Sequence, residues 1–303
     1  MLITLNGKEI NLPDFFIVGV SRSGTTSFNF LLKQHPQIFM PPIKEPFFFN
    51  GPYFGNYNVP QTGINTIEKY IQLFEQASKD QVLGEATTMY LYFFKNVISN
   101  LRNIYGERHK DIKIIICLRN PAERAFSHYK FYKRDGLDPL DFEEAIKDEV
   151  IKKRRKQNAG YDYVGFGMYY EQVKAYMENF SFVKVFIYED FVNDNLKVIK
   201  EIFGFLDVDD SFTPELRRYN VAGKIKSRWL HEFIFFKKNI VKNILKHFMP
   251  LDLRIRLGHK ILEKNTRQWE MPPDLKKKLS VLFKDDIHNL QHLLDKNLSF
   301  WMN

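Results

Sequence analysis

The chain has 303 residues, of which 44% are hydrophobic and 27% are charged, and this globular composition excludes extensive disorder. Its 45 basic and 36 acidic residues give a formal net charge of +9, which predicts an anionic partner such as nucleic acid, an acidic membrane face or a polyanionic small molecule. The single cysteine, Cys117, excludes an intrachain disulfide framework and a cysteine-rich metal site. Because it lies within an apolar run, we expect it to be buried.

No targeting or membrane-spanning segment is predicted. No stretch approaches about 18 consecutive apolar residues, the length that a spanning helix needs. The first nine residues lack the charged start and apolar run of a signal peptide, which favours a cytoplasmic location.

Short apolar segments alternate with amphipathic ones along the chain. In chain order the pattern predicts a strand at 15–20, helices at 25–33 and 66–78, a short strand at 81–84, a strand at 113–118, helices at 122–132, 141–158 and 167–180, a strand at 183–188 and a helix at 195–206. Asn120 is a candidate N-cap, with Pro121 in the first helical position. The five cations at 152–156 are typical of a solvated helix end.

Strands that alternate with helices indicate an α/β fold with a mostly parallel sheet. The part after Trp229 is predicted to be entirely helical. The chain shows no internal repeat and no flexible linker, so we expect a single domain over 1–303, with 229–303 as its helical C-terminal extension.

A glycine-containing turn joins the first strand to the first helix. Residues 19–26, GVSRSGTT, fit the outline of the phosphate-binding P-loop, G-x-x-x-x-G-K-[ST], except that Thr25 stands in place of the lysine. Glycine lets the backbone fold round an anion, the helix N-terminus presents free N–H groups, and Arg22 adds a permanent cation. Without the lysine that holds the β- and γ-phosphates, the loop suits a shorter anion. The alternative is an ordinary turn capped by hydroxyls.

A second anion site is expected after the strand at 113–118. Arg119 follows that strand directly, and ligands of open α/β sheets bind at the carboxyl ends of parallel strands. Ser127 lies eight residues later, two turns along the next helix. This Arg–Ser pair suggests a second phosphate site, and the alternative is that Arg119 caps a turn while Ser127 faces solvent.

Together the two segments resemble the PAPS-dependent sulfotransferases, in their bacterial and carbohydrate or heparan-sulfate-like branch. Residues 22–27, RSGTTS, are similar to the family's loop for the 5′-phosphosulfate, and residues 118–127, LRNPAERAFS, to its 3′-phosphate motif. The family's sulfonate donor is PAPS, 3′-phosphoadenosine 5′-phosphosulfate, and its product is PAP. The segment at 285–301 also resembles the chain end of bacterial members, so the likeness covers nearly the whole length. It implies a P-loop-like three-layer α/β fold and no metal.

The resemblance implies a role for each matching residue. Arg22, where the family usually has Lys, would neutralise charge on the leaving group and so act in catalysis. The 5′-phosphosulfate would bind to Arg22, Ser23, Gly24, Thr25, Thr26 and Ser27. Arg119 and Ser127 would hold the 3′-phosphate. A late basic loop would close over PAPS through Gly223, Lys224, Lys226, Ser227 and Arg228, although such a run also fits a solvated linker.

Sulfonate transfer to a hydroxyl requires a base that takes the acceptor's proton. Glu45, in the segment IKEPFFF, resembles the base of the carbohydrate-type enzymes, and its place before Pro46 favours an extended conformation. The alternative is an exposed loop carboxylate beside Lys44. The segment at 84–90, GEATTMY, lacks the His that serves as base in the cytosolic small-molecule branch, and has Ala86 where heparan-sulfate types carry Lys. His128, beside Ser127, is a rival base, but packing or solvent exposure is the expected fate of a lone His.

The resemblance implies a hydroxyl-bearing acceptor, which is a carbohydrate, a glycolipid or another small molecule, and Lys44, Glu85 and Thr87 are candidates to contact it. Residues 229–250 interleave apolar side chains with lysines, which fits a helix packed on the core or one in peripheral contact with a membrane. A P-loop-type nucleotide kinase that requires ATP and Mg²⁺, and a basic nucleic-acid-binding module, remain alternatives. The chain carries no nucleic-acid recognition motif, so no nucleic acid partner is expected.

Overall fold

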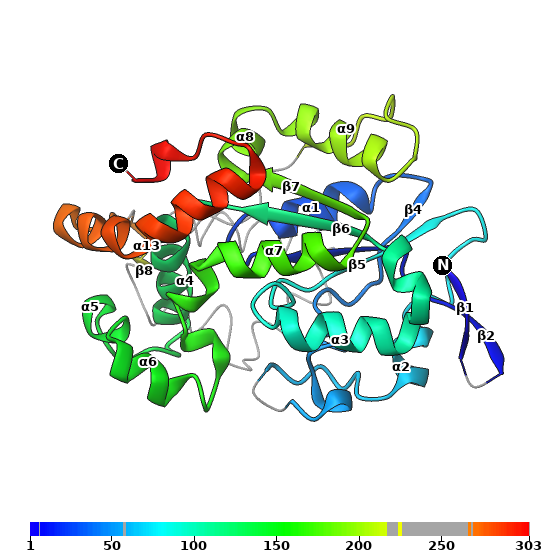
Figure 1. Ribbon diagram of the computed structural model, residues 1–303, viewed down its shortest axis with the longest axis horizontal. Helices are drawn as coiled ribbons and strands as arrows, with labels where there is room; N and C mark the ends of the chain where they lie inside the picture. Colours follow the sequence, from blue (N-terminus) through cyan, green and yellow to red (C-terminus); the bar gives the residue numbers. More distant parts are fainter. Residues whose placement is uncertain (6, 57–58, 217–223, 226–265, 268, 303) are drawn as a thin grey trace, which may run out of the picture.

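The computed structural model describes residues 1–5, 7–56, 59–216, 224–225, 266–267 and 269–302. Its centre is a five-stranded sheet in the order β4-β5-β3-β6-β7, in which every neighbouring pair runs parallel (Figure 1). These strands are β3 (Phe15–Gly19), β4 (Ile38–Phe39), β5 (Val82–Ala86), β6 (Lys113–Leu118) and β7 (Phe182–Ile187). The parallel sheet confirms the α/β class expected from the sequence.

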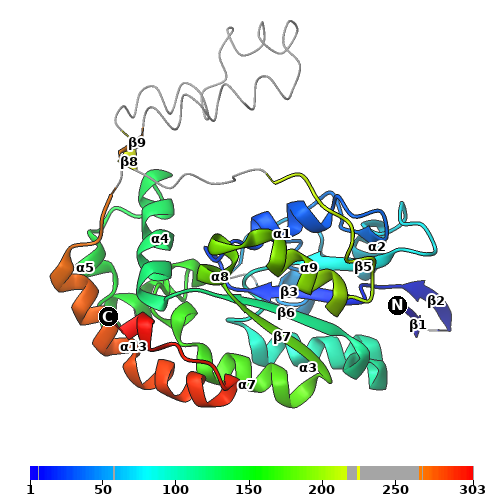
Figure 2. The same cartoon turned by 90° about the horizontal axis from the view of Figure 1, so that it is seen from above.

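Helices cover both faces of the sheet and make three layers (Figure 2). One face carries α1 and α9, and the other carries α3, α7 and α13. Their bounds are α1 (Thr25–Leu32), α3 (Phe94–Tyr105), α7 (Tyr169–Asn179), α9 (Asn195–Phe205) and α13 (Pro273–Leu294). The helix α4 (Pro121–Arg134) begins at the carboxyl end of β6.

Each central strand contributes to two hydrophobic cores, because successive side chains of a strand point to opposite faces. Phe15 of β3 and Cys117 of β6 pack in the core beneath α1 and α9. Phe16 and Ile114 pack in the larger core on the opposite face. Cys117 is fully buried, as predicted, and this burial raises the pKa of its thiol.

Several predicted elements differ in extent. The helix expected at 66–78 is the shorter α2 (Ile67–Gln72), and the one at 141–158 is divided into α5 (Phe142–Ala145) and α6 (Asp148–Arg154). The sequence analysis did not predict α3, the short strand β4, a hairpin of β1 (Leu2–Leu5) and β2 (Lys8–Asn11), or α8 (Tyr188–Asn193).

The part after Trp229 was predicted to be entirely helical, and this prediction is wrong at residues 266–267, which form a strand. The strand β9 (Thr266–Arg267) pairs antiparallel with β8 (Lys224–Ile225). The helical prediction holds for α13 and for the final 3₁₀ turn, η5 (Ser299–Met302), while 229–265 lie outside the described residues. Among the described helices, none is long and apolar enough to cross a membrane.

The basic run at 152–156 lies at the end of α6 and is mostly solvated, as predicted, because only Arg154 is not exposed; two of its arginines also pair with interior carboxylates. Arg154 lies with Nη2 3.0 Å from Oδ1 of Asp138, a carboxylate that is buried. Arg155 lies with Nη1 3.4 Å from Oδ2 of Asp162, which is also buried. These two arginines neutralise interior carboxylates, which would otherwise be costly to bury.

Candidate active site

The loop between β3 and α1 turns at two residues in the left-handed region. Gly24 has φ +80°, a conformation that favours glycine, and a Cβ there would make a tight contact of 3.1 Å with the ring of Tyr188. Arg22 has φ +75° although it is not glycine. Backbone conformations of this kind cost energy in non-glycine residues and cluster at functional sites.

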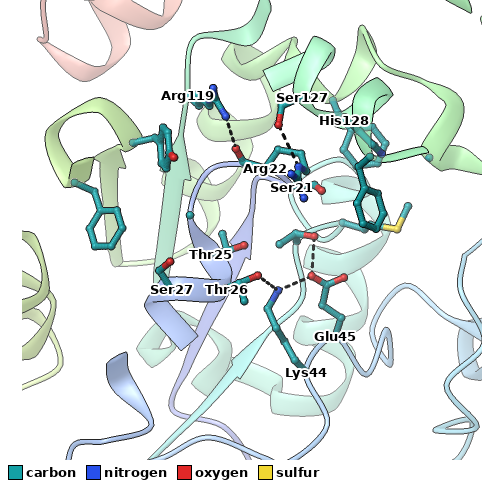
Figure 3. Close-up of a pocket in the computed structure, with 18 of the residues that line it drawn as sticks. Ser21, Arg22, Thr25, Thr26, Ser27, Lys44, Glu45, Arg119, Ser127 and His128 are labelled. Atoms are coloured by element: carbon teal, nitrogen blue, oxygen red, sulfur yellow. Dashed lines mark hydrogen bonds and ion pairs between the residues drawn. The ribbon is translucent and has the colours of Figure 1, made fainter. Parts of the chain in front are cut away.

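A cavity of about 830 Å³ opens at the carboxyl ends of β3 and β6, the edge where ligands of parallel sheets bind. Its size is within the usual range of about 300–1,000 Å³ for small-molecule sites. The predicted site residues in its wall are Arg22, Gly24, Thr25, Thr26, Ser27, Lys44, Glu45, Arg119 and Ser127 (Figure 3). The structure therefore brings both predicted anion motifs and the predicted base to one cavity.

Two hydrogen bonds join the anion motifs directly. The Nε of Arg22 donates to Oγ of Ser127 at 3.3 Å, although the two residues are 105 positions apart (Figure 3). The Nη1 of Arg119 donates to the backbone O of Arg22 at 3.2 Å. These contacts follow from the sheet order, because β3 and β6 are neighbours and the motifs extend from their carboxyl ends.

Cations accumulate in this wall. Burial, and the nearby charges of Arg134 and Arg119, lower the pKa of the Arg22 guanidinium to about 10. Arg22 and Arg134 both lie over the ring of Phe131, at 5.2 and 4.9 Å from its centroid, and Arg119 lies 4.8 Å from the ring centroid of Tyr188. Mutual repulsion of this kind is relieved when an anion binds, so the wall is suited to phosphate or sulfate groups.

Asn120 is the N-cap of α4, as predicted. Its Oδ1 accepts from the backbone N–H groups of Ala122 at 3.0 Å and Glu123 at 3.2 Å. Its Nδ2 donates to the backbone O of Trp301 at 3.1 Å, and the Tyr169 hydroxyl donates to the backbone O of Arg119 at 2.9 Å. The start of the second anion motif is therefore held by α7 and by the C-terminal segment.

Glu45 lies across the cavity on a strained loop. The extended conformation expected before Pro46 is wrong, because Glu45 has φ +57° and its N–H bonds to the backbone O of Ala86 at 3.0 Å. Its Oε1 accepts from Lys44 Nζ at 2.8 Å and from Thr88 Oγ1 at 3.1 Å, while no described residue donates to Oε2. Lys44 Nζ also donates to Thr26 Oγ1 at 3.2 Å and so links this loop to the first anion motif (Figure 3).

Three predicted site residues are fully buried and do not line the cavity. Glu85 accepts from the Tyr70 hydroxyl at 2.5 Å and from Thr87 Oγ1 at 2.6 Å, and burial raises its pKa to about 7. Glu85 and Thr87 are therefore buried in the protein interior next to the cavity. Thr88, which was not predicted as a site residue, lines the cavity instead. The Oγ of Ser23 is buried with no hydrogen-bond partner among the described residues.

The late basic loop lies mostly outside the described residues, which exclude Gly223, Lys226, Ser227 and Arg228. Lys224 belongs to β8, whose backbone lies against α4 (Figure 2). The predicted amphipathic helix at 229–250 is also outside the described residues.

Sequence reasoning missed an apolar wall beside Arg119. Tyr188, Phe191 and Val192 of α8 line the cavity together with Leu31 of α1. The available signal was the position of Tyr188 directly after β7, because carboxyl ends of parallel strands share one edge of the sheet. Within the described ranges, no group of three His, Cys, Asp or Glu side chains is placed to hold a metal ion.

Comparison with known proteins identifies the family. A model of the sulfotransferase domain matches residues 12–270. Among curated relatives, the membrane-associated sulfotransferase kil1 of Dictyostelium discoideum is 33% identical over 154 residues, which are 49% of this chain and 30% of that protein. The bifunctional heparan sulfate N-deacetylase/N-sulfotransferase 2 of Mus musculus is 34% identical over 134 residues, 43% of this chain and 14% of that protein. The chain thus spans less than a third of the length of these relatives.

A solved structure agrees over the whole fold. The crystal structure of a sulfotransferase from Alicyclobacillus acidocaldarius superposes with a TM-score of 0.72 and 28% sequence identity, covering 97% of this chain and all of the other. The family match extends from before β3 to beyond β9 and includes both anion motifs. The chain belongs to the sulfotransferase domain family.

Proposed function

We propose that the protein transfers a sulfonate group from PAPS to a hydroxyl of a carbohydrate, glycolipid or other small-molecule acceptor. The observation that carries this proposal is the junction of the two anion motifs. Arg22 and Arg119 reach one cavity from neighbouring strands, and hydrogen bonds connect Arg22 to Ser127 and Arg119 to the Arg22 backbone.

The donor groups in the wall suit PAPS, which carries phosphate at two ends of one nucleoside. In this proposal Arg22, Thr25 and Thr26, which line the cavity at the N-terminus of α1, bind the 5′-phosphosulfate. Arg119 and Ser127 bind the 3′-phosphate in the same proposal, and the ring of Tyr188 in the cavity wall offers an aromatic face for the adenine. Arginines neutralise the phosphates in this proposal, without a metal.

Glu45 is the proposed general base, and its Oε2 is the oxygen available to take the acceptor's proton. Lys44 is proposed to contact the acceptor or the transferred group, because its ammonium lies between Glu45 and Thr26. Arg22 stabilises the leaving phosphate as negative charge develops on it. The name of one curated relative, the heparan sulfate N-deacetylase/N-sulfotransferase 2 of Mus musculus, favours a carbohydrate acceptor.

Other properties stay predictions of the sequence. They are the single-domain organisation, the cytoplasmic location, the closure of the late basic loop over PAPS, and the peripheral membrane contact of 229–250. One relative is named a membrane-associated sulfotransferase, which gives the membrane contact some support.

Calorimetry with PAP in the presence of a chelator tests the donor site. We expect PAP to bind to the wild type, and to bind much more weakly to Arg119→Ala. Absence of PAP binding together with binding of ATP–Mg²⁺ would favour a kinase instead. Incubation with labelled PAPS and a cell extract, followed by mass spectrometry, then identifies the acceptor.

A further inference from the structure

His128 lies in the cavity wall on α4, directly after Ser127. Its side chain is only 5% exposed. In Figure 3, His128 lies to the upper right of Arg22 and Glu45 to its lower right, whereas Arg119 lies to its upper left. The rings of Tyr132 and Phe166, which also line the cavity, stand nearly perpendicular to the imidazole at centroid distances of 4.8 and 5.6 Å.

A buried arginine determines which imidazole nitrogen carries the proton. Arg124, fully buried one turn earlier, places Nη1 3.3 Å from Nδ1 of His128 and donates through Nη2 to the backbone O of Tyr163. A guanidinium has N–H donors and no acceptor, so Nδ1 must be the acceptor in this pair. The proton of a neutral imidazole is then on Nε2.

The surroundings also keep the ring neutral. Burial, and the positive charges of Arg124 and Arg22, lower the pKa of His128 well below its ordinary value. No described residue forms a hydrogen bond with Nε2. This atom is also not completely buried, so a ligand in the cavity can reach it. The Nε2–H group is therefore a donor that no described part of the chain uses.

We propose that His128 is a fixed, neutral hydrogen-bond donor that binds an oxygen of the acceptor through Nε2–H. The inference rests on the proposed sulfotransfer function for the identity of the ligand, but the tautomer follows from the Arg124 contact alone. It also removes His128 from the candidate bases, because a nitrogen that already carries a proton cannot take one from the acceptor.

Substitution separates a donor from a base. Glutamine places an amide N–H near the position of Nε2 but is not a base, and leucine has a similar size and no donor. We expect His128→Leu to raise the KM for the acceptor by about 3- to 10-fold, the usual effect of one lost hydrogen bond. His128→Gln should recover most of that loss, and the affinity for PAP should be similar in both variants.

Equal and severe loss of kcat in both variants would identify His128 as a base and overturn the proposal. A loss of PAP affinity in His128→Leu that His128→Gln recovers would place the contact on the nucleotide instead, and would also overturn it.

A second measurement does not depend on activity. In the ¹⁵N–¹H spectrum of the imidazoles of the intact chain, with PAP bound and unbound, His128 should show the Nε2–H tautomer from pH 6 to pH 8. His109 supplies a matched reference, because its Nδ1 lies 2.7 Å from the backbone O of Gly106 and must donate there. A His128 signal with the proton on Nδ1, or on both nitrogens, would refute the tautomer even if the enzyme transfers sulfonate.

Discussion

Replacement of Glu45 by glutamine is the sharpest test of the proposed chemistry. The amide keeps the size of the carboxylate and can still accept from Lys44 and Thr88 through its oxygen, so the loop should keep its shape. What disappears is the negative charge and the basic oxygen. The Lys44–Glu45 ion pair is partly exposed, at 24% and 26%, so its loss should cost at most about 1 kcal/mol of folding stability.

The catalytic effect should be much larger than this structural one. A positioned general base contributes about 10²–10⁴ in rate, which corresponds to about 3–5 kcal/mol of barrier. PAP affinity should stay near that of wild type, because Glu45 has no hydrogen bond or ion pair with Arg22 or Arg119 and bonds instead to Lys44 and Thr88. Turnover would therefore fall by a factor that lost stability cannot produce.

The assay measures labelled sulfonate transferred from PAPS to an identified acceptor, with calorimetry of PAP as the binding control. Lys44→Met is the matched variant, because it breaks the same ion pair and leaves the carboxylate in place. Glu45→Gln should lose more turnover than Lys44→Met. If Glu45→Gln worked within a factor of a few of wild type, Glu45 would not be the base.

Three further predictions concern the anion motifs and the buried carboxylate. Arg119→Ala should weaken PAP binding by about 2–3 kcal/mol, measured by calorimetry, whereas Arg22→Ala should also lower kcat because its contact strengthens as the leaving phosphate gains charge; equal, purely binding defects would contradict this. Asn120→Ala removes a helix cap and leaves the buried Trp301 carbonyl without its donor, so it should lower Tm by about 4–8 °C; an unchanged Tm would rule this out. The pKa of Glu85 is raised from 4.5 to about 7, which means that the folded protein binds the proton of this carboxyl more tightly than the unfolded chain does. Protonation of Glu85 therefore makes its whole contribution to folding stability below about pH 4.5, and this contribution is lost as the pH rises through 7. Denaturant unfolding should show wild type losing stability relative to Glu85→Gln over that range, and parallel pH profiles would refute it.

The elements nearest the site were the most predictable from sequence. The strand β6 has the predicted bounds, because an apolar run of branched residues ends at Arg119. The start of α4 was equally clear, because an Asn cap followed by proline is a local signal that needs no tertiary contact. The sequence also pointed to the segments that carry both anion motifs and the proposed base, through their resemblance to family motifs, and all three segments line one cavity.

Features that depend on distant contacts were not predictable. The conformation of Glu45 is set by bonds to Ala86 and Thr88, more than forty positions later. The burial of Glu85 depends on the hydroxyl of Tyr70, and the aromatic wall on where α8 packs. The two-residue strands β4 and β9 are too short to show a period in sequence.

The bond between Asn120 and Trp301 also bears on the order in which the molecule completes its folding. The partners are 181 positions apart, and the other clamp on this motif, from Tyr169 to Arg119, spans 50. Contacts of such long range form late, because the loop between them must close first. During synthesis the β3–α1 loop emerges early, but the second half of the cavity wall gains its last support only after α13 has been made. A nascent chain should therefore bind an anion with two phosphate groups, such as PAP, at full affinity only after the C-terminal turn η5 has packed against the start of α4.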